Sequence, residues 1–230
     1  MFPLRDENPS LTAPVVTRAL IGANLVAFLY EIALGPDLRT FLFHWSFIPV
    51  RLMLAVDGGA ESIAAPALTL LTSMFLHGGW LHLIGNMWYL WIFGDNIEDR
   101  FGHLRFLLFY LAAGIAAGLL HYVAHVDSRL PTVGASGAIA GVLGAYAAAF
   151  PRARVVTLLP IFPFFQVIAL PALLVLGVWF VFQFASGALS GGAGGGVAWW
   201  AHIGGFLFGF LLTRLSTPRR RRTSGAWVEP

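Results

Sequence analysis

The chain of 230 residues contains no cysteine, which excludes disulfides, thiolate metal sites and cysteine nucleophiles. Charged residues are also scarce: they make up 11% of the chain, whereas soluble domains carry about a quarter. Apolar residues take their place, because 58% of the chain is hydrophobic and the mean hydropathy is +0.77. This balance indicates an integral membrane protein.

Six apolar stretches are long enough to predict membrane-spanning helices. They cover residues 15–34, 80–95, 105–125, 133–150, 166–186 and 198–213. The second is short, but we expect the preceding TLLTSMFLHGGW to extend it. The sequence therefore predicts an all-α bundle of six transmembrane helices. One membrane domain, residues 15–216, would lie between a mobile N-terminus, residues 1–14, and a basic C-terminal tail, residues 217–230.

Lysine is absent as well, so all fourteen basic residues are arginines, and their distribution predicts the topology. With the N-terminus inside, eleven arginines lie on the inner side and three, Arg39, Arg51 and Arg129, lie outside. Both termini are then cytoplasmic. We expect the RRRR run of the tail to contact anionic lipid rather than nucleic acid. We also expect a bacterial inner membrane protein, whose outer side is the periplasm.

The connection between the first two predicted spans, residues 35–76, is long and lies outside. It contains FLFHWSFIPVRLMLAV, whose aromatic and aliphatic side chains would be costly to expose to water. We therefore expect short helices that lie partly in the membrane interface.

We single out four polar residues that lie in apolar surroundings within the predicted spans, where such groups are costly and often functional: His82, Asn86, Ser136 and His202. At about 1.5 Å per helical residue, Ser136, His202 and His82 lie roughly 22, 18 and 20 Å above the inner ends of their helices. All three helices run from outside to inside, so the three side chains reach one level, roughly 10 Å below the outer surface of the apolar core. Because the three side chains lie at the same depth in three separate helices, we predict that they form one functional site.

Ser136 and His202 have the chemistry of a nucleophile and its base, since a neutral histidine activates a serine hydroxyl by accepting its proton. GxxxG patterns that begin at Gly137 and Gly205 would allow the two helices to pack closely. The acidic residues of the outer side all lie in loops, so we predict a Ser-His dyad rather than a triad. Taken singly, each residue also fits a packing role, as a serine among small residues or a core histidine bonded to a carbonyl.

His82 and Asn86 lie four residues apart and share a helix face. Both can donate a hydrogen bond to a developing oxyanion, and the glycines around Ser136 leave a backbone N–H free to point at the same oxygen. The alternative is that they are polar contacts between helices. No metal or other cofactor is expected, because the sequence has no HExxH motif and the candidate site histidines are not joined by a nearby carboxylate.

Several short sequence blocks occur in a fixed order, and together they form a pattern that is specific for one protein family. HGGWLHLIGN spaces His77, His82 and Asn86 as H-x4-H-x3-N, GASG surrounds Ser136, and AHIGGFLFG surrounds His202. EDR follows the second span at residues 98–100. In these blocks, over residues 15–214, the chain resembles the rhomboid family of intramembrane serine proteases.

The resemblance implies a six-helix rhomboid bundle with Ser136 as nucleophile, His202 as general base and an oxyanion hole made by His82 and Asn86. His77 would be structural or water-associated, and Trp179 resembles the bulky gate residues of the family. Residues 98–100 would be a folding element. The implied activity is that of a serine endopeptidase that cuts transmembrane protein substrates near their outer ends. Its partners would be these substrates and the lipid bilayer, and no nucleic acid.

Two other functions compete with this one. A catalytically silent rhomboid-like protein would bind transmembrane clients without cutting them. A polar solute channel or transporter would depend on His82 and Asn86 but not on Ser136. The first outer loop also lacks the Trp-Arg pair that is common in the family, so its detailed fold is left open, as is the oligomeric state.

Overall fold

The computed structural model describes residues 1–59, 62–161, 164–189, 198–216, 221–223 and 226–228. Its helices are α1 (Val15–Ala33), α2 (Leu38–Trp45), α3 (Pro49–Val56), α4 (Ala64–Thr72), α5 (Trp80–Phe101), α6 (His103–Ala124), α7 (Ser136–Ala149), α8 (Ala172–Leu189) and α9 (Trp199–Leu215). Two 3-10 helices are η1 (Gly35–Asp37) and η2 (Ser73–Phe75). The strands are β1 (Phe2–Asp6), β2 (Arg154–Ile161), β3 (Phe164–Pro171), β4 (Arg221–Thr223) and β5 (Ala226–Val228).

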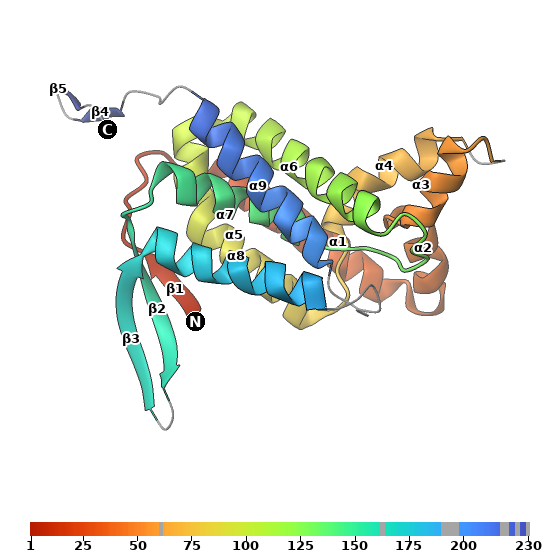
Figure 1. Cartoon of the computed structure of the whole chain (residues 1–230), viewed down its shortest axis with the longest axis horizontal. Helices are drawn as coiled ribbons and strands as arrows, with labels where there is room; N and C mark the ends of the chain where they lie inside the picture. Colours follow the sequence, from red (N-terminus) through yellow and green to blue (C-terminus); the bar gives the residue numbers. More distant parts are fainter. Residues whose placement is uncertain (60–61, 162–163, 190–197, 217–220, 224–225, 229–230) are drawn as a thin grey trace.

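Helix α7 is the centre of the bundle. Every residue from Gly137 to Ala147 is buried, and α5, α6, α8 and α9 surround the helix (Figure 1). Its side chains are mostly alanine and glycine, so neighbouring helices can approach its backbone. The helix that begins with Ser136 is therefore the most enclosed element of the bundle.

Glycines set the distance between α7 and α9. A methyl group added to Gly205 would collide with the carbonyl oxygen of Gly137, and one added to Gly209 would collide with that of Gly141. These are the residues of the two predicted GxxxG faces, and the close packing predicted for them is confirmed.

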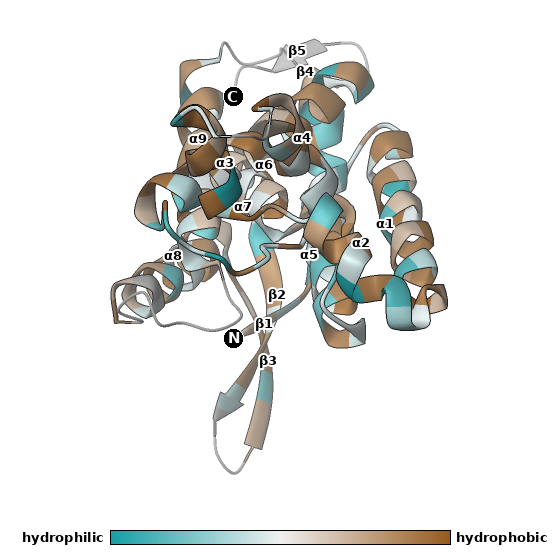
Figure 2. Cartoon of the chain, turned by 90° about the vertical axis from the view of Figure 1, so that its right-hand side faces the viewer, coloured by the Kyte–Doolittle hydropathy of each residue, from teal (hydrophilic) through white to brown (hydrophobic). Residues whose placement is uncertain are grey.

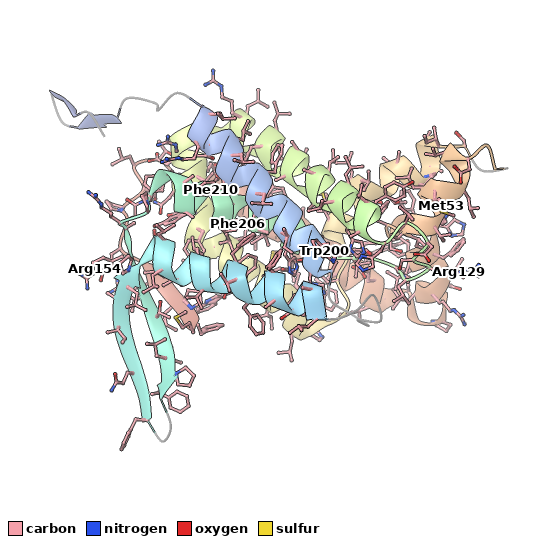
Figure 3. The ribbon with its side chains drawn as sticks, in the orientation of Figure 1. Met53, Arg129, Arg154, Trp200, Phe206 and Phe210 are labelled. Carbon is pink, nitrogen blue, oxygen red and sulfur yellow. The ribbon has the colours of Figure 1, made fainter. Side chains whose placement is uncertain are left out.

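The two ends of the bundle differ. The short helices α2, α3 and α4 gather at one end, while β1 and the strands β2 and β3 lie at the other (Figure 1). Arg129 and Arg154, which the topology assigns to opposite sides of the membrane, lie at these opposite ends (Figure 3). The expectation of short helices in residues 35–76 is confirmed. The residues before α5 do not extend it, however, because α4 and η2 meet it at 81°.

Apolar helices make this an integral membrane protein. Helices α1 and α6 are each long and apolar enough to cross a bilayer, and α5 passes the same test together with α4 as a bent pair. Helices α7 and α8 are apolar but shorter. Much of the α1 ribbon has the brown colour of hydrophobic residues (Figure 2). The multi-pass helical bundle is thus confirmed, while the count of six spans stays a prediction.

The sheet is an addition that the all-α prediction omitted. Strands β1, β2 and β3 pair antiparallel in that order, with Phe2 opposite Leu158 and Val156 opposite Ala169. Residues 166–171, expected to open the fifth span, instead form most of β3, and α8 begins at Ala172. Pro171 agrees with this boundary, because proline lacks the N–H that a helix interior needs but is tolerated where a helix begins.

The N-terminal residues attach to the bundle. The prediction of a mobile end at residues 1–14 did not anticipate β1. The Trp88 indole donates to the Pro3 carbonyl over 2.8 Å, and the Tyr146 hydroxyl donates to Asp6 over 2.5 Å. At the C-terminal tail, residues 217–220, 224–225 and 229–230 lie outside the described residues, so the role predicted for the tail stays a prediction.

Glu98, the first residue of the EDR block, supports the start of α1. Its buried carboxylate accepts the backbone N–H groups of Val16 and Thr17 over 2.8 and 2.7 Å, and the Thr17 hydroxyl over 2.7 Å. The ring of His103 lies 2.6 Å from the same carboxylate. A carboxylate at the N-terminus of a helix accepts hydrogen bonds from backbone N–H groups that have no partner within the helix, and its negative charge interacts favourably with the helix dipole. A folding role for Glu98 agrees with this geometry.

Candidate active site

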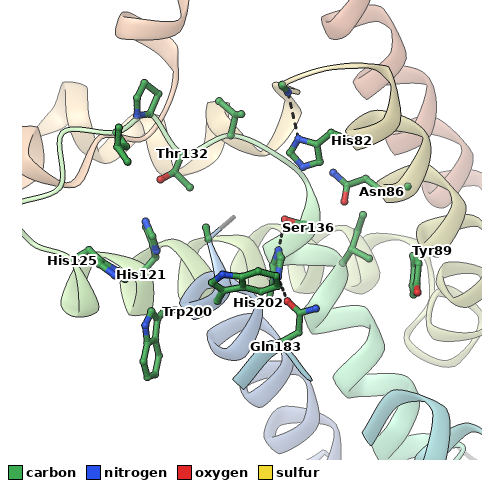
Figure 4. A pocket seen from close by; sticks show the side chains of 18 of the residues that line it. His82, Asn86, Tyr89, His121, His125, Thr132, Ser136, Gln183, Trp200 and His202 are labelled. Carbon is green, nitrogen blue, oxygen red and sulfur yellow. Dashed lines mark hydrogen bonds between the residues drawn. The ribbon is translucent and has the colours of Figure 1, made fainter. Parts of the chain in front are cut away.

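The candidate site lies where three helices begin. His82, Ser136 and His202 lie within the first turn of α5, α7 and α9 and line one cavity, while the membrane depth expected for them stays a prediction. A cavity of about 750 Å³ opens between these helix ends and α8 (Figure 4). Its polar lining includes His82, Asn86, His121, Ser136, Gln183 and His202.

Ser136 and His202 are in contact. The Ser136 Oγ lies 2.8 Å from His202 Nε2, within hydrogen-bond distance (Figure 4). The imidazole is buried, whereas the serine is partly exposed toward the cavity. The contact predicted from the two GxxxG faces is therefore confirmed, because their close approach brings the two helix starts together.

Gln183, on α8, is a member of the site that the sequence reading missed. Its Oε1 lies 2.6 Å from His202 Nδ1, and its side chain is buried (Figure 4). A signal was present, because Gln183 is an amide inside the apolar run VWFVFQF and so meets the criterion that selected Asn86. Its proximity to His202 could not be read from the sequence, since the two residues belong to different helices.

His82 and Asn86 face the cavity from α5, beside the loop that leads to Ser136. His82 Nδ1 accepts the Gly78 N–H over 3.4 Å, which leaves its Nε2 as the donor. Gly134 has a φ of 124°, and a Cβ there would lie 2.7 Å from His82 Nε2 and 3.6 Å from Asn86 Nδ2. Only glycine fits such a backbone next to both side chains. The loop thus holds both donors close to the start of α7.

The Asn86 amide is buried without a partner. Its Nδ2 has no hydrogen-bond partner among the described residues, although it lines the cavity. A buried donor without a partner is costly to the folded protein. Asn86 and Ser136 line the same cavity, so this amide is available to a group bound there (Figure 4).

His77 and Trp179 lie at the sides of the site. His77 is buried behind His82, with their ring centroids 5.1 Å apart, and its backbone N–H donates to Glu31 over 3.1 Å. It is not among the residues that line the cavity. Trp179 does line the cavity, and its ring centroid lies 6.0 Å from that of His202. Their predicted roles remain predictions.

Two further histidines belong to the same cavity. His121 and His125, at the end of α6, line its outer part with ring centroids 5.0 Å apart (Figure 4). The place of this histidine pair at the cavity follows from the packing of α6 beside α7 and α9.

The arrangement can support acyl transfer. A hydroxyl touches a ring nitrogen that can accept its proton, and two side-chain donors with a helix N-terminus surround the space where negative charge would form. The fold and the site thus define a membrane-embedded helical bundle with a serine–histidine pair in a polar cavity.

Comparison with known proteins identifies the family. The Rhomboid domain family model matches residues 65–219. This range includes every residue of the candidate site and the glycine-packed helices that carry it. The chain belongs to the rhomboid family.

Relatives come from mitochondria and from a bacterium. The chain is 34% identical over 149 residues to mouse presenilin-associated rhomboid-like protein, mitochondrial, with 61% of this chain and 36% of that protein covered. It is 30% identical over 225 residues to Rhomboid protein 1, mitochondrial, of Saccharomyces cerevisiae, with 91% and 57% covered. Rhomboid protease GluP of Bacillus subtilis is 49% identical over 76 residues, which cover 33% of this chain and 14% of that protein.

The chain therefore spans about a third of the length of the mouse relative and somewhat more than half of the yeast one. These relatives do not support the expectation of a bacterial inner membrane, because two of the three are named as mitochondrial. The chain is a multi-pass membrane protein, but its assignment to a bacterial inner membrane is not supported.

Proposed function

We propose that this protein is a serine endopeptidase that cleaves transmembrane segments of other membrane proteins. The observation that carries the proposal is the 2.8 Å contact between Ser136 Oγ and His202 Nε2 inside a polar cavity. Membership of the rhomboid family and similarity to a relative named as a rhomboid protease support it.

In the first step, Ser136 Oγ attacks the carbonyl carbon of the substrate while His202 Nε2 takes the hydroxyl proton. The carbonyl oxygen becomes an oxyanion that His82, Asn86 and the backbone N–H at the start of α7 stabilise. His202 then returns the proton to the departing amine, and the peptide bond breaks to leave an acyl-enzyme. Water, activated by the same imidazole, hydrolyses this ester and restores Ser136.

The substrate must reach a site within the membrane. The cavity is lined by α5 on one side and α8 on the other, so a transmembrane segment would enter between these helices, with Trp179 as the gate candidate. Peptide hydrolysis also needs water, which the polar cavity admits at a depth where lipid would exclude it. The site would open to the outer side, and cleavage would fall near the outer end of the substrate segment.

Replacing Ser136 tests the proposal. Ser136→Ala should abolish cleavage of a reconstituted transmembrane reporter and labelling by a fluorophosphonate probe, because both need the nucleophilic oxygen. Ser62→Ala, on the exposed loop before α4, is the matched control and should leave both unchanged. Cleavage that survives in Ser136→Ala would overturn the proposal, and reporter binding without cleavage by the unmodified protein would favour a silent rhomboid-like binder.

The oxyanion donors are tested separately. His82→Ala and Asn86→Ala should each lower turnover by up to about a hundredfold, as loss of one oxyanion donor does, while labelling of Ser136 falls less. Unchanged turnover in both variants would remove them from the site.

A further inference from the structure

The imidazole of His202 is held on both nitrogens. Nε2 contacts the Ser136 hydroxyl over 2.8 Å, and Nδ1 contacts Gln183 Oε1 over 2.6 Å. We propose that Gln183 is a positioning residue that fixes the tautomer and the ring orientation of His202. This inference rests on the proposed function, because it assigns the third group that the serine–histidine pair would need.

The carbonyl oxygen of an amide can only accept hydrogen bonds. With Gln183 Oε1 at Nδ1, the neutral imidazole carries its proton on Nδ1, and Nε2 keeps the lone pair that faces Ser136. This is the tautomer that can accept the serine proton. Without an acceptor at Nδ1, the proton could move to Nε2, and two donors would then face each other at the position of attack.

The acceptor is neutral, which distinguishes it from the carboxylate of a triad. No acidic residue occurs among the described residues that line the cavity, so Gln183 supplies the orienting contact in a place where a buried charge would be costly. An amide fixes the ring, but it stabilises the imidazolium less than a carboxylate would.

Helix α8 holds the ring with two side chains. Trp179 lies one turn before Gln183 and therefore on the same helix face. Its ring centroid lies 6.0 Å from that of His202, so the imidazole has an indole beside it and an amide at Nδ1. The base would thus be correctly oriented only while α8 is seated against α9.

Two substitutions at Gln183 separate orientation from packing. Gln183→Met keeps the length of the side chain but loses the acceptor, so kcat should fall about 10- to 100-fold with little change in KM, since misorientation of a reacting group costs rate. Gln183→Glu keeps an acceptor and adds charge, which favours the imidazolium. Its kcat should stay within about tenfold of the unmodified enzyme, and the acidic limb of its pH–kcat profile should move upward by about one pH unit.

Val181→Met is the matched control. It places the same residue on the exposed side of α8, two positions away, and should change neither kcat nor the pH profile. The proposal is overturned if kcat of Gln183→Met stays within about twofold of the unmodified enzyme. A folded Gln183→Glu variant with no activity, or with an unmoved acidic limb, would overturn it as well. If Gln183→Met does not fold, the pH profile of Gln183→Glu decides alone.

A spectroscopic measurement distinguishes this inference from the proposed function. In the unmodified protein, ¹⁵N spectra should show the His202 proton on Nδ1, with the resonance assigned by its loss in His202→Ala. Gln183→Met should shift the tautomer toward Nε2, whether or not the protein cleaves a reporter. An unchanged tautomer would overturn the role of Gln183. Absence of cleavage and labelling in the unmodified protein would instead overturn the proposed function.

Discussion

Helices α7 and α9 meet backbone to backbone, whereas α8 lies at the edge of the bundle and reaches the site through side chains. A Cβ at Gly205 would strike the main chain of α7, while one at Gly177 in α8 would meet nothing within 4 Å. Much of α8 is exposed at Leu173, Leu174, Val178, Val181, Phe182 and Phe184. Ser136 and His202 therefore lie on two helices in backbone contact, whereas Trp179 and Gln183 lie on a peripheral helix with an exposed side.

This difference separates two requirements of the proposed chemistry. The distance between Ser136 and His202 has to be constant, and close glycine packing fixes it because main-chain atoms cannot adopt another rotamer. The entry of a substrate requires movement, and a peripheral helix with few main-chain contacts can move at lower cost.

The largest effect is expected where the backbones touch. Gly205→Ala should destabilise the protein by about 3 kcal/mol and abolish activity, because the added methyl group cannot avoid the carbonyl oxygen of Gly137. Thermal unfolding in detergent micelles and fluorophosphonate labelling of Ser136 measure the two effects. A variant with the original unfolding temperature would show that α7 and α9 can separate freely, and the comparison would fail.

A smaller effect is expected where a single side chain attaches a peripheral helix. Glu98→Gln should cost about 2 kcal/mol, because an amide has one acceptor oxygen and turns an NH₂ group toward the donors at the start of α1. Asp99→Asn, at the next position, removes the same charge from a partly exposed side chain that accepts the Thr12 hydroxyl over 2.7 Å. Equal losses of stability in the two variants would argue against a special role for Glu98.

The contact between the N-terminal strand and α7 should depend on pH. Burial raises the pKa of Asp6 from 3.8 to about 6, so the folded protein favours the protonated carboxyl. The stabilisation of the folded protein by the protonated Asp6 carboxyl is fully present below about pH 4 and is lost as the pH rises through 6. Because the group is only half-buried, Asp6→Asn should stabilise the protein by no more than about 1 kcal/mol at pH 8.

Unfolding temperatures between pH 4 and 8 test this prediction. Asp6→Asn should flatten the pH dependence, while the neighbouring Glu7→Gln should leave it in place. A profile that is the same with and without Asp6 would exclude this residue as its source.

The smallest effect is expected on α8. Gly177→Ala should change stability by less than about 1 kcal/mol, and in the stabilising direction, because alanine favours a helix and the site has room for a methyl group. This variant is the matched counterpart of Gly205→Ala. A large destabilisation here would mean that α8 is packed as tightly as α9, and the comparison would lose its basis.

Much of the fold could be predicted from the sequence because long apolar runs have one stable solution in a bilayer. The predicted spans at residues 15–34 and 105–125 agree with α1 and α6 to within about two residues, as expected for helix boundaries. The strands could not be found in this way. Residues 166–171 are as apolar as a span, and only their pairing with β2 shows that they are extended.

The site was predicted in part. Ser136, His202, His82 and Asn86 were chosen because polar groups in apolar helices are costly, and all four line one cavity. Gln183 satisfies the same criterion but was not chosen. Its part in the site depends on which way α8 faces, and a nearly uniform apolar helix carries no periodic signal of its orientation.

The sequence by itself determined that the chain is a membrane protein, that a serine and a histidine would lie at one depth, and that glycines would bring their helices together. These properties depend on composition and on spacing along single helices. Only the tertiary structure decided which atoms meet: the 2.6 Å contact of Gln183 with His202, the strand β1 against the bundle, and the cavity between α5 and α8. The reason is physical, because contacts between helices depend on their relative rotation and tilt, which are set by packing against all neighbours at once.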